Sequence, residues 1–258
     1  MPMAFDAASL LLGPGGSFLL VVARVSGLAW LAPGWGTTGL CWRLRLALIV
    51  LLSLVLMPTL GTSVTAPSSW AMLAQTCLTE ALIGAALGWT AALVISAARQ
   101  AGEVVGAQAG LSPAALFDPE SGGEMTPLGH LYGLIALGTF LALDGPLALV
   151  GALIESYRTV PAAGLPLTAE SAAWAFGQVG QALGLALRIA APAAVALALA
   201  GVAIALISRA APTLQFMALA LPLRTAVGVF LVWIGLVTLV AALASAWANL
   251  PVTMFARV

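Results

Sequence analysis

The sequence predicts an all-α membrane protein, built from helical hairpins and from broken or half helices instead of a conventional bundle of parallel spans. Of its 258 residues, 62% are hydrophobic and 7% are charged, whereas about 25% are charged in an average soluble domain. The mean hydropathy is +1.11, which excludes a soluble globular fold. The apolar runs are also uneven, and several fall short of the ~20 residues that a helix needs to cross a bilayer.

The first two apolar runs are short. Ser17–Leu31 contains Arg24, and Leu44–Met57 follows Arg43 and Arg45. Runs of this length predict helical hairpins or half helices. The third run, Ala71–Gly110, would be about 60 Å long as one helix, roughly twice the hydrocarbon thickness. We therefore expect it to bend, to break or to project beyond the lipid.

The remaining runs are interrupted in different ways. Residues 128–143 and 147–154 flank Asp144-Gly145-Pro146, which is typical of a tight hairpin tip. Residues 183–207 are interrupted by Arg188 and Pro192. Thr225–Trp247 alone has the length and the absence of charge expected of an ordinary span.

Small residues recur at every fourth position in two stretches, so each set lies along one face of a helix and permits close approach of another backbone. We expect these glycines to pack against a neighbouring helix or subunit. After the second stretch, the chain must leave the helical conformation at Ser112-Pro113 and again at Asp118-Pro119. The candidate packing residues are Gly84 and Gly88, in the stripe that Glu80 begins, and Gly102 and Gly106 in the second.

Ionisable residues within apolar segments are costly and are candidate functional residues. Purely structural roles remain open as alternatives. Glu80 would be a helix-end carboxylate near the headgroups, and Arg99 and Glu103 would neutralise each other as an ion pair. Other arginines would extend their side chains toward the membrane surface. The candidate buried charges are Glu80, Arg99, Glu103, Arg188 and Arg209.

Enzymatic chemistry has little support. The chain has one histidine, His130, at an expected helix start, and it has no nucleophile elbow, paired-histidine zinc motif or phosphate-binding loop. All nine basic residues are arginines and the net charge is zero, so the pattern gives no basic footprint for nucleic acid. We expect no catalytic residue, no metal and no cofactor.

A series of short pieces, spread over residues 17 to 240, together resembles the FliR family of flagellar export-apparatus proteins and its injectisome counterpart, SctT. Each piece is weak alone, whereas their order and spacing are specific. They are Arg24-Val-Ser-Gly, Arg43 with Arg45, Glu80 to Gly88, Ala101-Gly102-Glu103, Gly110-Leu111-Ser112, Phe117-Asp118-Pro119, Glu155-Ser156-Tyr157 and Ser208-Arg209-Ala-Ala-Pro212.

The resemblance implies a structural and gating subunit of a flagellar type III secretion export gate in the bacterial inner membrane, within the flagellar basal body. It implies partners similar to FliP, FliQ and FlhB, an FlhA-like subunit nearby, and unfolded exported proteins as substrates. The whole chain, 1–258, would be one domain, with a FliP-like part over about 1–170 and a FliQ-like helical hairpin over about 171–258.

In that family the loop after the glycine-rich helix projects into the pore as a plug, which here corresponds to a pore loop over 110–127. The injectisome counterpart stays an alternative, because residues 124–129 are closer to injectisome members. A secondary transporter with broken helices is a further alternative. The residues that would form the plug are Gly110, Leu111, Ser112, Pro113, Leu116, Phe117, Asp118 and Pro119.

Overall fold

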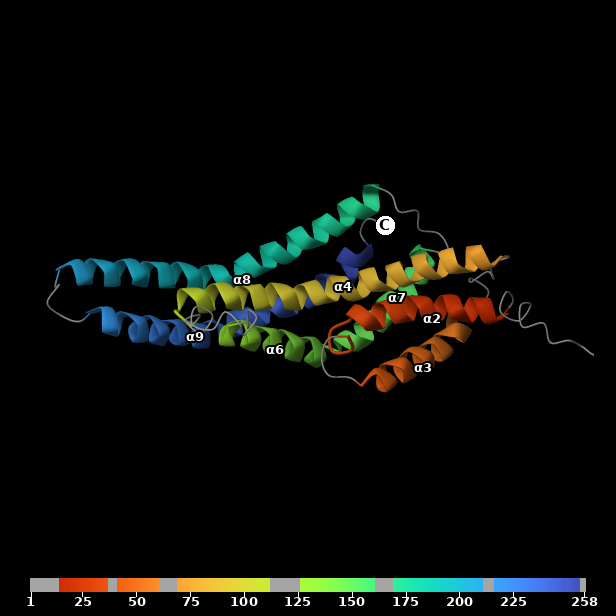
Figure 1. Ribbon diagram of the computed structural model, residues 1–258, viewed down its shortest axis with the longest axis horizontal. Coiled ribbons are helices and arrows are strands. Elements are labelled where there is room, and N and C mark those ends of the chain that lie inside the picture. The colour runs from red at the N-terminus through yellow and green to blue at the C-terminus, as the bar shows by residue number, and fades with distance from the viewer. Residues whose placement is uncertain are drawn as a thin grey trace, which may run out of the picture. The chain divides into compact units, whose positions relative to one another are not determined.

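The computed structural model describes residues 14–36, 41–60, 69–111, 126–160, 169–210 and 216–255. Within these ranges the regular secondary structure is entirely α-helical (Figure 1), which confirms the predicted all-α class. The helices are α2 (Pro14–Leu31), α3 (Trp42–Leu60), α4 (Trp70–Gln108), α6 (Pro127–Ala142), α7 (Gly145–Thr159), α8 (Ala169–Ala210) and α9 (Phe216–Phe255).

Three helices are long and apolar enough to cross a membrane, namely α4, α8 and α9, with 39, 42 and 40 residues. The expectation of a single ordinary span was therefore wrong. The expected interruption near Pro192 is also absent, because α8 continues through it. A proline removes one backbone donor, and neighbouring groups in a membrane helix can compensate for that loss.

The break between α6 and α7 lies at residues 143–144, where Asp144 has a left-handed backbone with φ of 53°. Each helix begins with a proline in its first turn, where the missing N–H would have had no helical partner. By length and hydropathy the two helices together pass as a broken span or a re-entrant loop, and the sequence placed a hairpin tip at this break. The prediction of broken and half helices holds at this point.

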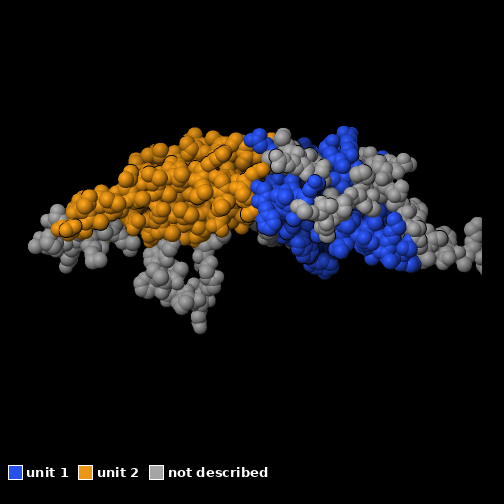
Figure 2. Space-filling view, turned by 90° about the horizontal axis from the view of Figure 1, so that it is seen from above, with its two compact units in different colours: residues 1–92, 144–178, 249–258 blue, residues 93–143, 179–248 orange. Residues whose placement is uncertain are grey.

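The chain divides into two compact units, which Figure 2 colours separately. The first comprises Met1–Ala92, Asp144–Gln178 and Asn249–Val258. Its core contains fully buried leucines from α2 and α7, such as Leu20, Leu28 and Leu153. Apolar residues of the first half of α4 complete this core, among them Leu87.

The second unit comprises Leu93–Leu143 and Val179–Ala248. Small side chains line the buried face of α4 here, including Ala98, Ala101 and Val105. Larger residues come from the other helices, among them Phe140 of α6, whose ring centroid lies 4.8 Å from that of Trp247 of α9. The Trp247 Nε1 also donates to the Thr139 hydroxyl at 3.3 Å.

Helices α8 and α9 leave most of their apolar surface uncovered by the chain itself. Only 17% of the most apolar part of α8 and 22% of that of α9 is buried, compared with 50% for α4. Their exposed side chains include Leu199, Trp233 and Val237. Helices that are apolar on all sides require lipid or another protein around them.

Candidate functional site

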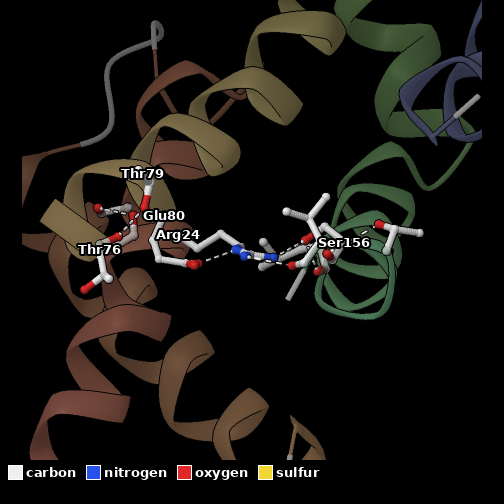
Figure 3. Close-up of polar contacts among 10 residues, drawn as sticks. Arg24, Thr76, Thr79, Glu80 and Ser156 are labelled. Carbon is white, nitrogen blue, oxygen red and sulfur yellow. Dashed lines mark hydrogen bonds and ion pairs between the residues drawn. The ribbon is translucent and has the colours of Figure 1, made fainter. Parts of the chain in front are cut away.

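The first unit contains a fully buried ion pair. The Nε of Arg24 on α2 lies 2.5 Å from Oε2 of Glu80 on α4 (Figure 3). Both side chains have 0% exposure. Taking two charges out of water is expensive, so such a pair persists only if further hydrogen bonds satisfy the remaining polar atoms. Glu80, one of the candidate buried charges, is thus fully buried in the structure.

The other nitrogens of Arg24 reach α7 and the residue after it. Nη1 donates to the Ser156 hydroxyl at 3.0 Å, and Nη2 donates to the Val160 carbonyl at 3.2 Å. The guanidinium carbon also lies 3.8 Å from the centroid of the Tyr157 ring, a cation–π arrangement. One arginine thus joins α2, α4 and α7, three helices that are far apart in sequence.

Glycines allow α2 and α4 to approach closely beside this pair. A side chain at Gly84 would collide with the backbone of Arg24, and one at Gly27 would collide with the backbone of Ala81. Gly88, one turn further along α4, packs in the same way against Leu28. The predicted glycine stripe is therefore used for helix packing, and its partner helix belongs to the same chain.

The second unit holds the end of α4, from which the predicted pore loop starts. Gly110 has a left-handed φ of 77°. The Leu111 N–H donates to the Gly106 carbonyl at 2.9 Å and the Gly110 N–H to the Ala107 carbonyl at 3.2 Å. This pair of bonds is a Schellman motif, which ends a helix at a glycine. The helix therefore stops before Ser112-Pro113, where the sequence placed the break.

Helix α9 holds the same end of α4. The Thr225 hydroxyl donates to the Ala109 carbonyl at 2.9 Å. Gly228, one turn further along α9, leaves room for the Ala109 side chain. The last carbonyls of a helix have no partner within it, so Thr225 satisfies one of them from outside.

The chain returns to the described residues at Thr126, which caps α6. Its hydroxyl accepts from the Gly129 N–H at 3.1 Å, and its own backbone N–H donates to Oε1 of Glu103 at 2.8 Å. Thr126 also lies against Gly106. A single turn of α4, residues 103–106, therefore contacts the start of α6 and receives the Leu111 N–H.

Two of the predicted charges are less buried than expected. Arg188 and Arg209 are exposed on α8, because this helix is covered little by the rest of the chain. Arg99 and Glu103 are half-buried and form no ion pair with each other; the described residues contain only the pairs Arg24–Glu80 and Arg158–Glu155. The Arg99 side chain instead crosses α6 at Gly133.

The second glycine pair also packs within the chain. A side chain at Gly102 would meet the backbone of Leu128 and Gly129, and one at Gly106 would meet Thr126. The sequence reasoning missed Ser156, Thr126 and Thr225, whose roles depend on partners from other helices. Ser156 and Thr126 lie within pieces that carried the family resemblance, Glu155-Ser156-Tyr157 and residues 124–129, whereas no sequence signal marked Thr225.

Most of the predicted plug lies outside the described residues. Gly110 and Leu111 are described, whereas Ser112, Pro113, Leu116, Phe117, Asp118 and Pro119 fall within 112–125. Among the described residues, no group of three or more His, Cys, Asp and Glu side chains could hold a metal ion.

Comparison with known proteins identifies the family. The model of bacterial export proteins, family 1, matches residues 16–250. The flagellar biosynthetic protein FliR of Escherichia coli is 33% identical over 190 residues, 73% of this chain and 72% of its own. FliR of Pectobacterium carotovorum is 30% identical over 220 residues, 82% and 81% of the two chains. The Yop proteins translocation protein T of Yersinia pestis is 33% identical over 151 residues, 57% and 58% of the two. The chain therefore belongs to the bacterial export proteins of family 1, as its resemblance to FliR and SctT predicted.

Proposed function

We propose that this chain is a structural and gating subunit of the protein-conducting export gate of a flagellar type III secretion system, located in the bacterial inner membrane within the basal body. It would form the pore with FliP- and FliQ-like subunits, next to FlhB- and FlhA-like subunits, and unfolded proteins would pass through it. The observation that carries the proposal is the family match over residues 16–250.

The uncovered apolar surface supports an assembled state. Helices α8 and α9 pack as antiparallel neighbours, since Gly201 lies beside Arg224 and Gly228 lies near Leu197. This pairing agrees with a FliQ-like helical hairpin at 171–258 in a domain that covers the whole chain. The exposed faces of both helices are available to other subunits or to lipid.

The geometry at the end of α4 supports the plug role of the 110–127 loop. The Schellman motif at Gly110 directs the chain out of the helix, and Thr126 brings it back to the same turn of α4. Both ends of the loop are therefore held at the same turn of α4. Its apolar residues Leu111, Leu116 and Phe117 would seal the pore against water and ions.

Deleting Leu111–Phe117 tests this role. We expect the complex to assemble with its FliP-like partner and to leak ions, measured as membrane conductance in cells or in planar bilayers. A matched control replaces the same residues with a glycine–serine segment of equal length, which keeps the loop but removes its apolar side chains and should also leak. An assembled complex with unchanged conductance would remove the plug role.

The three longest matches support a flagellar system. Three FliR relatives align over 73% to 84% of this chain, whereas three other FliR relatives align over 32% to 57% and the Yersinia translocation protein over 57%. The injectisome counterpart stays the second candidate because of that Yersinia match. Expression of this chain in a FliR-deficient strain should restore swimming. Restoration of secretion in a strain that lacks the injectisome counterpart, without restored swimming, would favour the injectisome role.

The transporter alternative has no specific support. Each nitrogen of the Arg24 guanidinium already donates within the chain, so this charge is not free to bind a solute. The proposed role requires no chemical step.

A further inference from the structure

The start of α6 lacks half of a capping box. In that motif the N-cap threonine bonds to the N–H of the third helical residue, and a Glu or Gln at that third position bonds back to the N–H of the cap. Thr126 makes the first bond, to Gly129. The third position is occupied by Gly129 itself, which has no side chain to make the second.

Helix α4 supplies the missing acid. Oε1 of Glu103 accepts the Thr126 N–H at 2.8 Å, which is the bond that a residue at position 129 would otherwise make. The carboxylate also lies at the N-terminus of α6, where the helix dipole favours negative charge. Glu103 is half-buried and has no arginine partner among the described residues, so this cap is its specific polar contact there.

Gly129 is what makes room for Glu103. A Cβ at position 129 would meet Oε1, Cδ and Cγ of Glu103, closer than real side chains approach. The same packing relation is found one turn further along α6, where the absence of a side chain at Gly133 makes room for the Arg99 side chain. The two helices run antiparallel in a register that places residue 103 against 129 and residue 99 against 133.

We propose that Glu103 is a positioning residue that completes the cap of α6 from α4 and thereby fixes the point at which the 110–127 loop returns. The cap itself follows from the contacts of described residues. The effect of this cap on the closed pore rests on the proposed function, in which the loop acts as a plug and both of its ends must be held in place.

The test moves the acid back to the position where a capping box normally has it. We compare Glu103→Ala, Gly129→Glu and the double variant Glu103→Ala/Gly129→Glu in the purified export complex. Glu103→Ala removes the three atoms that Gly129 accommodates, so a glutamate fits at 129 only in the double variant. Glu103→Gln keeps the accepting oxygen without the charge, and Glu155→Ala removes a carboxylate elsewhere, on α7.

Hydrogen–deuterium exchange over residues 126–133 reports the cap directly. We expect about tenfold faster exchange in Glu103→Ala, since a charge-assisted bond to the cap is lost. Exchange should also be fast in Gly129→Glu, and it should return to within about twofold of the wild type in the double variant. It should stay close to the wild type in Glu155→Ala and should be intermediate in Glu103→Gln, which keeps the accepting oxygen but loses the charge. A double variant that exchanges as fast as the single variants would overturn the proposal.

Ion conductance of the same complexes reports the loop. Variants with a fast-exchanging cap should leak, and the double variant should be sealed again. A fast-exchanging cap without a leak, in a complex whose loop deletion does leak, would overturn the positioning role. If the loop deletion does not leak either, the plug function fails, and the exchange data alone then decide whether Glu103 caps α6.

Discussion

Arg24 and Glu80 form an ion pair with an Nε–Oε2 distance of 2.5 Å, and neither side chain has any exposed surface. The pair is separated by 56 residues, so it exists only when α2 and α4 are packed. Removal of one member leaves the other charge buried without its partner, which is far more damaging than removal of both.

We therefore expect Arg24→Met to destabilise the chain by about 3–5 kcal/mol, and Glu80→Met to do so by a similar amount. The double variant Arg24→Met/Glu80→Met should recover much of this loss, because apolar side chains of similar volume replace the pair. Thermal unfolding in detergent, followed by loss of the monodisperse peak, measures the difference. Additive losses in the double variant would contradict the role of the pair.

Gly84→Ala should separate α2 from α4. Its new Cβ would collide with the Arg24 carbonyl, and a rigid backbone atom cannot move aside cheaply, so we expect a loss of about 1–3 kcal/mol. Gly184→Ala is the matched control, because nothing lies within 4 Å of that position on α8. Alanine there should stabilise the helix slightly. Equal melting temperatures for both variants of the isolated chain would refute the close packing at Gly84.

Gly110→Ala should weaken the end of α4. The position has φ of 77°, which costs an L-residue with a Cβ about 1–2 kcal/mol. Asparagine tolerates this conformation better, so Gly110→Asn should be milder. The measurement is hydrogen exchange of the Gly110 and Leu111 amides, which donate to the last turn of α4. Slower exchange of these amides in Gly110→Ala than in Gly110→Asn would be inconsistent with the left-handed cap.

Thr225→Val should loosen the contact between α9 and the end of α4. The substitution keeps the shape and removes the hydroxyl that donates to the Ala109 carbonyl, at a cost of about 1 kcal/mol. Thr238→Val is the control, since that exposed hydroxyl donates only to the Gly235 carbonyl of its own helix. Faster exchange at Leu111 is expected in the first variant alone. If exchange at Leu111 became equally faster in both variants, the cause would be the lower helix propensity of valine and not the lost hydrogen bond.

Much of the fold could be predicted from hydrophobicity and small-residue spacing. The third apolar run was expected at Ala71–Gly110 and is found as the helix Trp70–Gln108. The glycines at 84, 88, 102 and 106 were expected to pack, and they do. Periodicity shows which face of a helix is smooth, but it does not show which helix covers that face.

The charges were harder to predict because their partners are remote in sequence. An i, i+4 spacing favoured a pair between Arg99 and Glu103. In the structure the N-terminus of α6 offers Glu103 a backbone N–H, and Gly133 offers Arg99 space. Arg188 and Arg209 were candidate buried charges, yet little of α8 is covered by the rest of the chain and both arginines are exposed.

The bare surfaces of α8 and α9 also constrain how a cell can produce this protein. Each helix would be about 60 Å long, roughly twice the thickness of the hydrocarbon layer, so acyl chains cannot shield all of it. In the proposed assembly, copies synthesised in excess of the partner subunits would leave these surfaces uncovered and would aggregate or be degraded. The proposed assembly therefore requires synthesis of this chain to be balanced with that of its partners.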